Sequence, residues 1–131
     1  MRCERVEHPH LWLGTSSAAA WLGLANHEAI AAAKAGIVGL VLAAAASFGE
    51  RGIRVNAVAP GLVRTALTER ISTSDAARRA STAMHARGRL GELSDVAAAM
   101  AWLLDPAQSW VTGQVLGVDG GLATVRTRGG A

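Results

Sequence analysis

The sequence of 131 residues contains no tyrosine, one phenylalanine and one cysteine, Cys3. A single cysteine excludes an internal disulfide and a cysteine cluster for a metal, and it fits a reducing compartment, so we expect a cytoplasmic protein. His8 and His10 flank a proline near the start of the chain, a pattern typical of a polar tail. Because no further ligands accompany them, we predict no metal site.

Long runs of one charge are also missing. The net charge is +3, the arginines are scattered and no basic run reaches five residues. Proteins that bind nucleic acids gather their basic residues on one surface, so we expect no nucleic-acid partner. Hydrophobic residues make up 50% of the chain and charged residues 18%, which is the composition of a globular protein of one small domain.

Apolar residues concentrate in residues 29–48, where Lys34 is the only charged residue. About 20 apolar residues are enough to cross a bilayer, so a membrane helix is one interpretation. The lysine inside the run and the weak hydrophobicity of alanine and glycine favour another, a helix packed between a sheet and a neighbour. We therefore expect no membrane partner.

The order of the apolar segments predicts an α/β fold with about three parallel strands and covering helices. The strands are expected at 11–14, 53–59 and 114–118, and the helices at 27–48 and 95–104. We expect Asn26 and Ser94 to cap these helices and Pro60 to stop the middle strand. Gly36 and Gly39 weaken the long helix, which predicts the close approach of another backbone there.

Polar and turn-forming residues follow the first two predicted strands. Thr15–Ser17 follow the first strand, and Pro60–Thr65 follow the second and lead into the polar segment 66–92. Ligands of parallel α/β sheets bind at the carboxyl ends of the strands. The topology therefore predicts a pocket for a small-molecule substrate at this edge.

Four stretches of the sequence occur in the order in which one enzyme family has them. They are LGTSSAAA, AKAGIVGL, RGIRVNAVAPGLVRT and WVTGQVLGVDGG. Together they resemble the second half of the short-chain dehydrogenase/reductase family over residues 11–124. The resemblance implies an oxidoreductase that uses NAD or NADP and has the C-terminal half of a Rossmann-type doubly wound parallel sheet.

The resemblance also implies roles for individual residues. Ser17 takes the position of the catalytic serine, and Lys34 that of the catalytic lysine, which also orients the ribose of the cofactor. A hydroxyl stabilises negative charge that develops on a substrate oxygen, and an ammonium lowers the pKa of an adjacent acid. Without the resemblance, Ser17 is equally typical of a turn and Lys34 of a lysine that reaches from a helix to solvent.

The loop after the middle strand is implied to bind the cofactor. In this loop, Pro60 and Gly61 shape a turn that brings the backbone close to the ligand. The Val63 backbone and the Thr65 hydroxyl take the positions that contact the carboxamide of the nicotinamide.

The catalytic tyrosine of the family has no counterpart. Ile30 stands four residues before Lys34, where the tyrosine is expected, and it cannot exchange a proton. A divergent branch, the bacterial enoyl reductases, places its tyrosine seven residues before the lysine, and here that residue is His27. Imidazole is a competent acid or base near neutral pH, so we predict that His27 is the proton donor. Its other interpretation is an exposed residue in the first turn of the helix.

The resemblance implies one partial Rossmann-like domain over residues 1–131. Within it we expect an atypical tail at 1–10, a substrate-loop region at 66–92 and a second tail at 122–131. The Gly-rich turn and the residue that selects NAD or NADP, which belong to the first half of the family, have no counterpart. We therefore expect a truncated enzyme that is weak or inactive alone.

Two functions remain open at this point. One is hydride transfer to or from a carbonyl, alcohol or enone substrate by an NAD(P)-dependent oxidoreductase. The other is a non-catalytic, degenerate fragment that acts only as an oligomerisation or binding module. For either function we expect a homo-oligomer formed through the 27–48 helix.

Overall fold

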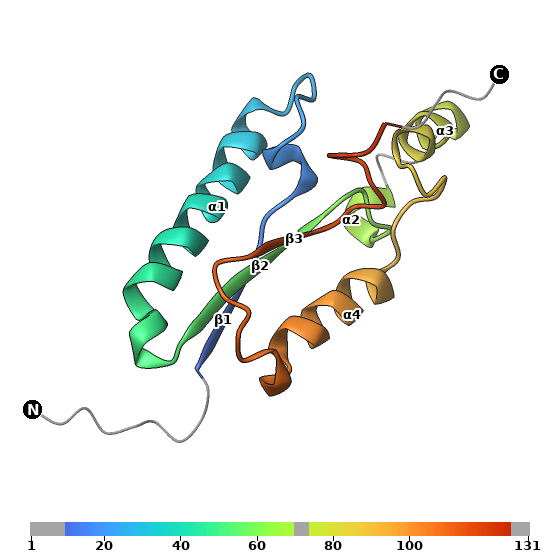
Figure 1. Cartoon of the computed structure of the whole chain (residues 1–131). Coiled ribbons are helices and arrows are strands. Elements are labelled where there is room, and N and C mark those ends of the chain that lie inside the picture. Colours follow the sequence, from blue (N-terminus) through green and yellow to red (C-terminus); the bar gives the residue numbers. More distant parts are fainter. Residues whose placement is uncertain (1–9, 70–73, 127–131) are drawn as a thin grey trace, which may run out of the picture.

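The computed structural model describes residues 10–69 and 74–126. Three parallel strands, β1 (Leu11–Thr15), β2 (Arg54–Pro60) and β3 (Val115–Val118), form a sheet in the order β1-β2-β3. Helix α1 (Glu28–Phe48) covers one face and α4 (Leu93–Leu104) covers the other (Figure 1). The predicted α/β fold with three parallel strands and covering helices is confirmed.

Five short helices connect these elements. They are η1 (Ala18–Ala20), η2 (Gly49–Arg51), α2 (Ala66–Glu69), α3 (Asp75–Met84) and η3 (Pro106–Gln108). Residues 1–9 of the predicted N-terminal tail, 70–73 of the substrate-loop region and 127–131 of the second tail lie outside the described residues.

The core lies where α1 crosses β2. Every residue of β2 except Pro60 is buried, as expected for a central parallel strand with helices on both faces. Successive side chains of a strand point to opposite faces, so Val55 and Ala57 pack against Val41 of α1. All three of these side chains are at most 1% exposed. On the opposite face, Leu103 of α4 is fully buried.

Two buried polar residues of β2 are hydrogen-bonded to the chain that leads into β3, although Arg54 Nε has no partner among the described residues. The Arg54 guanidinium donates to the carbonyls of Leu103, over 2.8 Å, and Asp105, over 3.3 Å. The Asn56 amide donates to the Val111 carbonyl over 2.9 Å, and its oxygen accepts from the Gln114 N–H over 3.0 Å. Buried polar groups are tolerated when hydrogen-bonded, so these residues fasten the last connection to the central strand.

Several predicted boundaries were wrong. Asn26 does not cap α1: it has a left-handed backbone (φ 61°), which asparagine tolerates, and His27 occupies the cap position. Ser94 lies inside α4. The helix begins at Leu93 with Glu92 as its cap, because the Asp95 carboxylate accepts from the Glu92 N–H. By contrast, the middle strand does stop at Pro60, as predicted, although the next amide, that of Gly61, still donates to the Val118 carbonyl.

Several large apolar side chains of α1 are exposed. Ile30, Leu40 and Leu42 are 47%, 53% and 58% exposed. A Cβ atom added to Gly36 or Gly39 would meet no other described atom within 4 Å, so the predicted close approach of another backbone does not occur within the described chain. By length and composition alone, the helix over Glu28–Arg51 could cross a membrane, so the structure leaves that interpretation open.

Candidate active site

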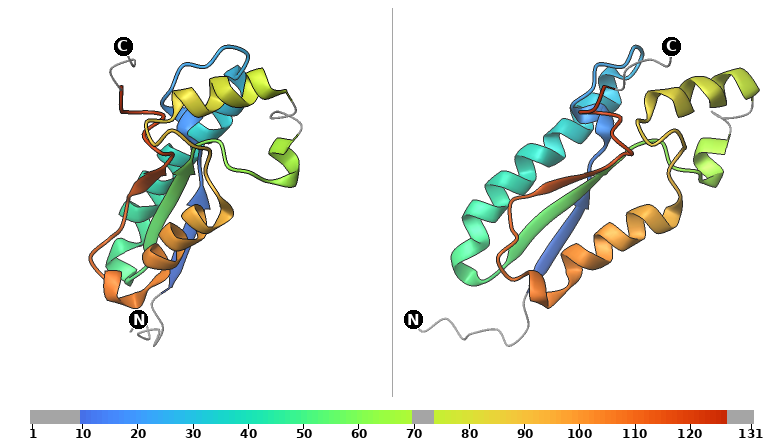
Figure 2. Two further views of the ribbon diagram at one scale, coloured as in Figure 1. Left: turned by 90° about the vertical axis from the view of Figure 1, so that its right-hand side faces the viewer. Right: turned by 45° about the vertical axis from the view of Figure 1, so that its right-hand side comes forward.

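The candidate site lies at the carboxyl edge of the sheet. Because the three strands are parallel, the segments that follow Thr15, Pro60 and Val118 leave the sheet at the same edge. Figure 2 shows α2 and α3 beyond this edge, past the ends of the strands. All the predicted site residues lie in these segments or in the first two turns of α1, where parallel α/β sheets bind their ligands.

Two hydrogen bonds tie α1 to the end of β1. The Lys34 ammonium donates to the Thr15 carbonyl over 2.9 Å, and the Ser16 hydroxyl donates to the Lys34 carbonyl over 2.9 Å. Ser16 is buried, whereas Ser17 is half-buried and its hydroxyl oxygen accepts from the Ala19 N–H as the cap of η1. An ammonium has three donors and a hydroxyl has one. Lys34 and Ser17 therefore keep hydrogen-bond donors beside the end of β1.

The orientation of the His27 ring follows from its single partner. Its Nδ1 lies 2.9 Å from the Ala25 carbonyl, which can only accept, so Nδ1 carries a hydrogen. In the neutral ring, Nε2 is then an acceptor, and as an imidazolium it is a donor. His27 is exposed, and within residues 10–69 and 74–126 no hydrogen bond joins it to Ser17 or Lys34.

The turn after β2 is packed so closely that a side chain at position 61 would force its neighbours to shift. The Gly61 N–H donates to the Val118 carbonyl over 3.2 Å and extends the ladder with β3. A Cβ atom at Gly61 would lie 2.9 Å from His85 Nε2 and 3.0 Å from the Asp119 Cα. The backbone after Pro60 therefore lies directly against the chain that leaves β3.

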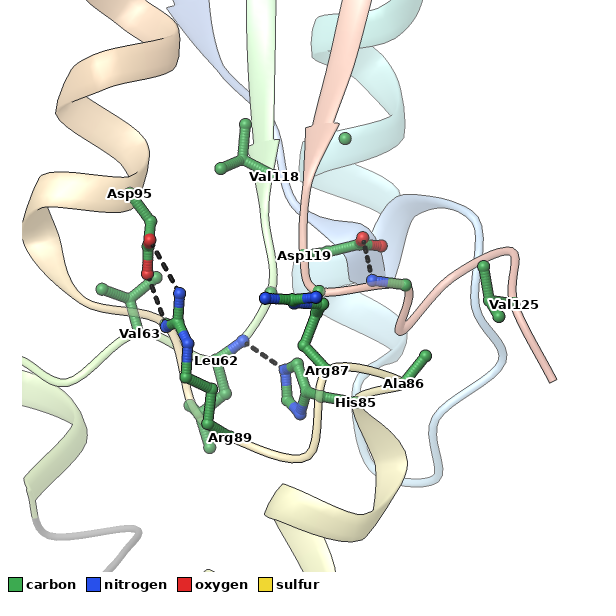
Figure 3. Close-up of a pocket in the computed structure, with 15 residues that line it drawn as sticks. Leu62, Val63, His85, Ala86, Arg87, Arg89, Asp95, Val118, Asp119 and Val125 are labelled. Atoms are coloured by element: carbon green, nitrogen blue, oxygen red, sulfur yellow. Dashed lines mark hydrogen bonds and ion pairs between the residues drawn. The ribbon is translucent and has the colours of Figure 1, made fainter. Parts of the chain in front are cut away.

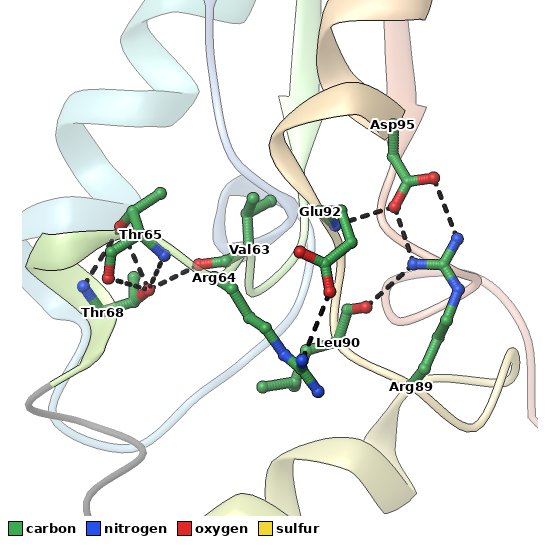
Figure 4. Close-up of polar contacts among 8 residues, drawn as sticks. All are labelled: Val63, Arg64, Thr65, Thr68, Arg89, Leu90, Glu92 and Asp95. Atoms are coloured by element: carbon green, nitrogen blue, oxygen red, sulfur yellow. Dashed lines mark hydrogen bonds and ion pairs between the residues drawn. The ribbon is translucent and has the colours of Figure 1, made fainter.

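The loop then enters α2 through a pair of threonines (Figure 4). The Thr65 N–H donates to the Thr68 hydroxyl over 2.9 Å, and the Thr68 N–H donates to the Thr65 hydroxyl over 3.2 Å. The Thr68 hydroxyl also donates to the Val63 carbonyl. By contrast, the Val63 N–H donates to no other residue in the described ranges. A buried residue with an unused amide can hold a carbonyl oxygen of a ligand.

Sequence reasoning missed His85, which packs against the same loop. His85 is 4% exposed; its Nδ1 lies 2.7 Å from the Ser81 carbonyl, and its Nε2 accepts from the Leu62 N–H over 3.2 Å. It directly follows the last residue of α3, in the polar segment 66–92. No local pattern indicated that this histidine contacts a residue 23 positions earlier.

A second missed group is the ion pair between Arg89 and Asp95 (Figure 4). The two Arg89 nitrogens lie 2.7 and 2.9 Å from the two carboxylate oxygens, a bidentate arrangement. The hydrogen bond from Arg89, followed by that from the Glu92 N–H, holds the pKa of Asp95 well below its usual range. Asp95 in turn raises the pKa of Arg89. The pair fixes the start of α4 next to the loop.

A cavity of about 450 Å³ lies between the loop and the exit of β3 (Figure 3). Gly61, Val63, His85 and Arg87 contribute to its lining, together with Asp119. A second hollow of about 440 Å³ lies beside Thr65 and α2.

The structure thus places the predicted residues in two groups along one edge. One group is Ser17 and Lys34 at the end of β1, with His27 at the start of α1. The other is the Pro60–Thr65 loop at the end of β2. The cavity described above is lined by the second group and not by the first.

Comparisons with known proteins add an independent observation. Residues 8–123 match a family model described as enoyl-(acyl carrier protein) reductase. The 2,5-dichloro-2,5-cyclohexadiene-1,4-diol dehydrogenase of Sphingobium indicum is 41% identical over 114 residues, which cover 86% of this chain and 46% of that protein. The chain therefore spans about half the length of this curated relative.

Solved structures show the same relationship. A short-chain type dehydrogenase/reductase from Mycobacterium ulcerans is 35% identical with a TM-score of 0.85, over 94% of this chain and 45% of that one. A structure of ElxO with NADP bound is 29% identical with a TM-score of 0.81, over 88% of this chain and 47% of that one.

Proposed function

Because the chain belongs to the short-chain dehydrogenase/reductase family, we propose that it supplies the substrate and nicotinamide side of an NAD(P)-dependent oxidoreductase. The observation that carries this proposal is the pairing of two groups at one sheet edge: Lys34 and Ser17 after β1, and the Val63 amide and Thr65 hydroxyl after β2. The reaction we propose is hydride transfer to or from a carbonyl, alcohol or enone substrate. A nicotinamide cofactor, when bound, supplies or accepts the hydride.

The residues present fit such a cofactor. The Val63 N–H donates to no other described residue, so an amide oxygen can accept from it. The Thr65 hydroxyl stands two residues further along the same loop, and Pro60 and Gly61 hold the backbone of the turn. The Lys34 ammonium keeps two donors for ribose hydroxyls after its bond to Thr15.

We assign the chemistry of the substrate to three residues. Ser17 donates a hydrogen bond to the substrate oxygen as negative charge develops on it. His27 supplies or takes the proton through Nε2, since its Nδ1 hydrogen is held by the Ala25 carbonyl. Lys34 stabilises the deprotonated side of that exchange through its positive charge. In this proposal His27 replaces the tyrosine of the family, which is Ile30 here.

The remainder of the proposal concerns what surrounds this site. We propose that residues 1–131 are one partial Rossmann-like domain. The binding site for the adenine and pyrophosphate of the cofactor then lies in a segment equivalent to the other half of the relatives. The chain alone is therefore weakly active. The 46% coverage of the Sphingobium relative supports this. A soluble, cytoplasmic location belongs to the same proposal and is supported by the single cysteine.

The chain offers a sharp test, because Lys34 is its only lysine. An amine-reactive acylating reagent therefore modifies one side chain, and the N-terminal amine is an internal control. We expect NADH or NADPH to slow acylation of Lys34 and not of the N-terminus. Equal rates with and without saturating NADH and NADPH would contradict the cofactor role of Lys34.

Catalysis is tested in a fusion of this chain to the first half of a relative. We expect the fusion to oxidise NAD(P)H with a carbonyl or enone substrate, and His27→Ala to lose about 100-fold or more in kcat, the usual contribution of a positioned acid or base. Ile30→Ala, three residues after His27 in the first turn of α1, is the matched control and should change kcat little. Full activity of His27→Ala would refute the role of His27.

A second candidate function has its own supporting observation. The exposed apolar face of α1, with Leu40, Leu42 and the open Gly36 and Gly39, suits a helix of a second copy of this chain, which would form a homo-oligomer. As a degenerate module, the chain would assemble through α1 and bind no cofactor. Sedimentation of wild type and Leu40→Lys tests the assembly: we expect an oligomer that Leu40→Lys weakens. An NADH titration distinguishes the module from the enzyme, because the module binds no cofactor. Solubility only in detergent would favour the membrane interpretation instead.

A further inference from the structure

His85 is the one buried histidine of residues 10–69 and 74–126, and neither of its nitrogens is free. Its Nδ1 lies 2.7 Å from the Ser81 carbonyl, one turn back in α3. Its Nε2 lies 3.2 Å from the backbone nitrogen of Leu62, in the loop after β2. The ring therefore joins the end of α3 to the middle of the loop.

These two partners determine the protonation of the ring. A carbonyl can only accept, so Nδ1 must carry a hydrogen. A backbone N–H can only donate, so Nε2 must present its lone pair. Both bonds exist together only in the neutral Nδ1–H tautomer. An imidazolium would carry a hydrogen on Nε2 and face the Leu62 N–H with a second donor.

The contact with the loop extends beyond this hydrogen bond. A Cβ atom on Gly61 would lie 2.9 Å from His85 Nε2, so the ring packs directly against the Gly61 backbone. Leu62 lies between this glycine and Val63, whose amide we assigned to the cofactor. In Figure 3 the ring points from the chain after α3 toward Leu62. A loss of the bond therefore removes one of the contacts that hold the segment next to Val63, which is also bonded to Gly91.

We propose that His85 is a positioning residue that fastens the Pro60–Thr65 loop to the end of α3 only while its imidazole is neutral. The hydrogen bond between His85 and Leu62 is a property of this chain alone. Its effect on cofactor binding rests on the proposed function. Protonation of the ring then releases the loop from α3 and weakens the nicotinamide seat.

The charged groups that share the cavity with His85 come from three segments. Arg87 and Arg89 lie on the chain that follows α3, Asp95 on α4 and Asp119 at the exit of β3. Arg89 and Asp95 are bound to each other. The Asp119 carboxylate accepts from the N–H groups of its own turn. None of these side chains is hydrogen-bonded to the His85 ring.

Two variants separate the hydrogen bond from the packing. His85→Gln keeps a side-chain oxygen that can accept from the Leu62 N–H but cannot be protonated near neutral pH. His85→Leu keeps an apolar body and removes the acceptor. A purely structural role of the ring would make both variants behave alike at every pH.

Hydrogen exchange of the Leu62 amide in the 131-residue chain is the decisive measurement. At about pH 7.5 we expect the protection factor to be roughly fivefold higher in wild type than in His85→Leu, as for one net hydrogen bond. At a pH low enough to protonate the ring, wild type should fall toward His85→Leu, because a charged ring cannot accept from the Leu62 N–H. His85→Gln should stay protected at both pH values. Wild-type protection without pH dependence, or equal protection in His85→Leu, would overturn the proposal.

The ring itself gives a readout that needs no variant. Long-range nitrogen–proton spectra of wild type should show the neutral Nδ1–H tautomer of His85 at about pH 7.5. The Nε2–H tautomer at about pH 7.5 would overturn the proposal.

Titration of the same proteins with NADH separates this inference from the proposed function. We expect His85→Leu to weaken NADH binding roughly fivefold at about pH 7.5 and His85→Gln to weaken it less than twofold. If Leu62 shows the expected exchange and wild type binds no NADH, the fastening by His85 is supported while the proposed cofactor function fails.

Discussion

On the β1 side of the carboxyl edge, the side chains of Ser17, His27 and Lys34 bind only backbone groups within the described part of the chain and keep polar atoms available. On the β2 side, the Pro60–Thr65 loop is held by side chains and backbone from distant segments, among them His85 and Gly91. The residues proposed to do chemistry thus keep polar atoms free for a ligand, and we call them the presented residues. The loop proposed to bind the cofactor is held in place by distant segments, and we call it the braced loop. The comparison indicates that a substitution that disturbs the packing of the braced loop costs stability, and that one at a presented residue costs binding or rate.

The largest expected effect is on the braced side. Gly61→Val places methyl groups where a Cβ atom alone would lie 2.9 Å from His85 Nε2 and 3.0 Å from the Asp119 backbone. We expect the free energy of unfolding in urea to fall by about 2–3 kcal/mol, the cost of overpacking. Gly36→Ala, where a Cβ meets no described atom within 4 Å, is the control and should raise it by about 0.5–1 kcal/mol. A similar loss in both variants would remove the contrast.

A smaller effect is expected for Lys34→Met, which keeps the stem and removes the ammonium. A charge-assisted hydrogen bond contributes about 1.5–3 kcal/mol, so the Kd for NADH, measured by fluorescence titration, should rise roughly tenfold or more. The stability in urea should change less than in Gly61→Val, because the ammonium binds one backbone carbonyl. Unchanged NADH affinity would show that Lys34 only ties α1 to β1.

Adjacent serines on the β1 side offer a direct comparison. Ser16→Ala removes a buried hydroxyl that donates to the Lys34 carbonyl, and should lower the free energy of unfolding by about 1 kcal/mol. Ser17→Ala, at a half-buried cap of a three-residue helix, should cost less stability but should lower kcat in the fused enzyme. The reverse order, with Ser17→Ala the less stable protein, would contradict the assignment.

The smallest effect concerns the exposed pair beside the loop. Because the folded state depresses the pKa of Asp95, its carboxylate stabilises the fold above the unfolded pKa of about 3.9. That contribution decreases as the pH falls below about 4 and is lost only as the pH passes the lower pKa of the folded state. We expect wild type to exceed Asp95→Asn in urea stability at about pH 6 and the difference to narrow at about pH 3. A difference that stays constant over this range would show that Asp95 acts through its shape alone.

The parts of the fold that the sequence predicted are those set by local pattern. The apolar run of β2 predicted a buried central strand, and the long alanine-rich segment predicted α1. The ends of elements were less predictable, because caps depend on backbone angles such as the left-handed Asn26. The sequence also did not predict that the side of α1 at Gly36 faces open space, because this depends on how the helix packs in the tertiary structure.

The candidate site divides in the same way. Spacing along α1 and the strand ends predicted which residues gather at the carboxyl edge, because parallel topology fixes that edge. The contacts of His85 with Leu62 and of Arg89 with Asp95 were not predictable, because they depend on where the chain returns after α3. The unused Val63 amide is likewise visible only once every hydrogen bond around it is known.

The most direct test of one ligand bridging both sides is an NADH titration of the isotope-labelled chain followed by amide chemical shifts. If the carboxyl edge is a nicotinamide site, the amides of Ser17 and Lys34 and those of Val63 and Thr65 should shift together, with one apparent Kd. Shifts confined to one of these two groups, or no saturable shifts at all, would contradict a shared cofactor site.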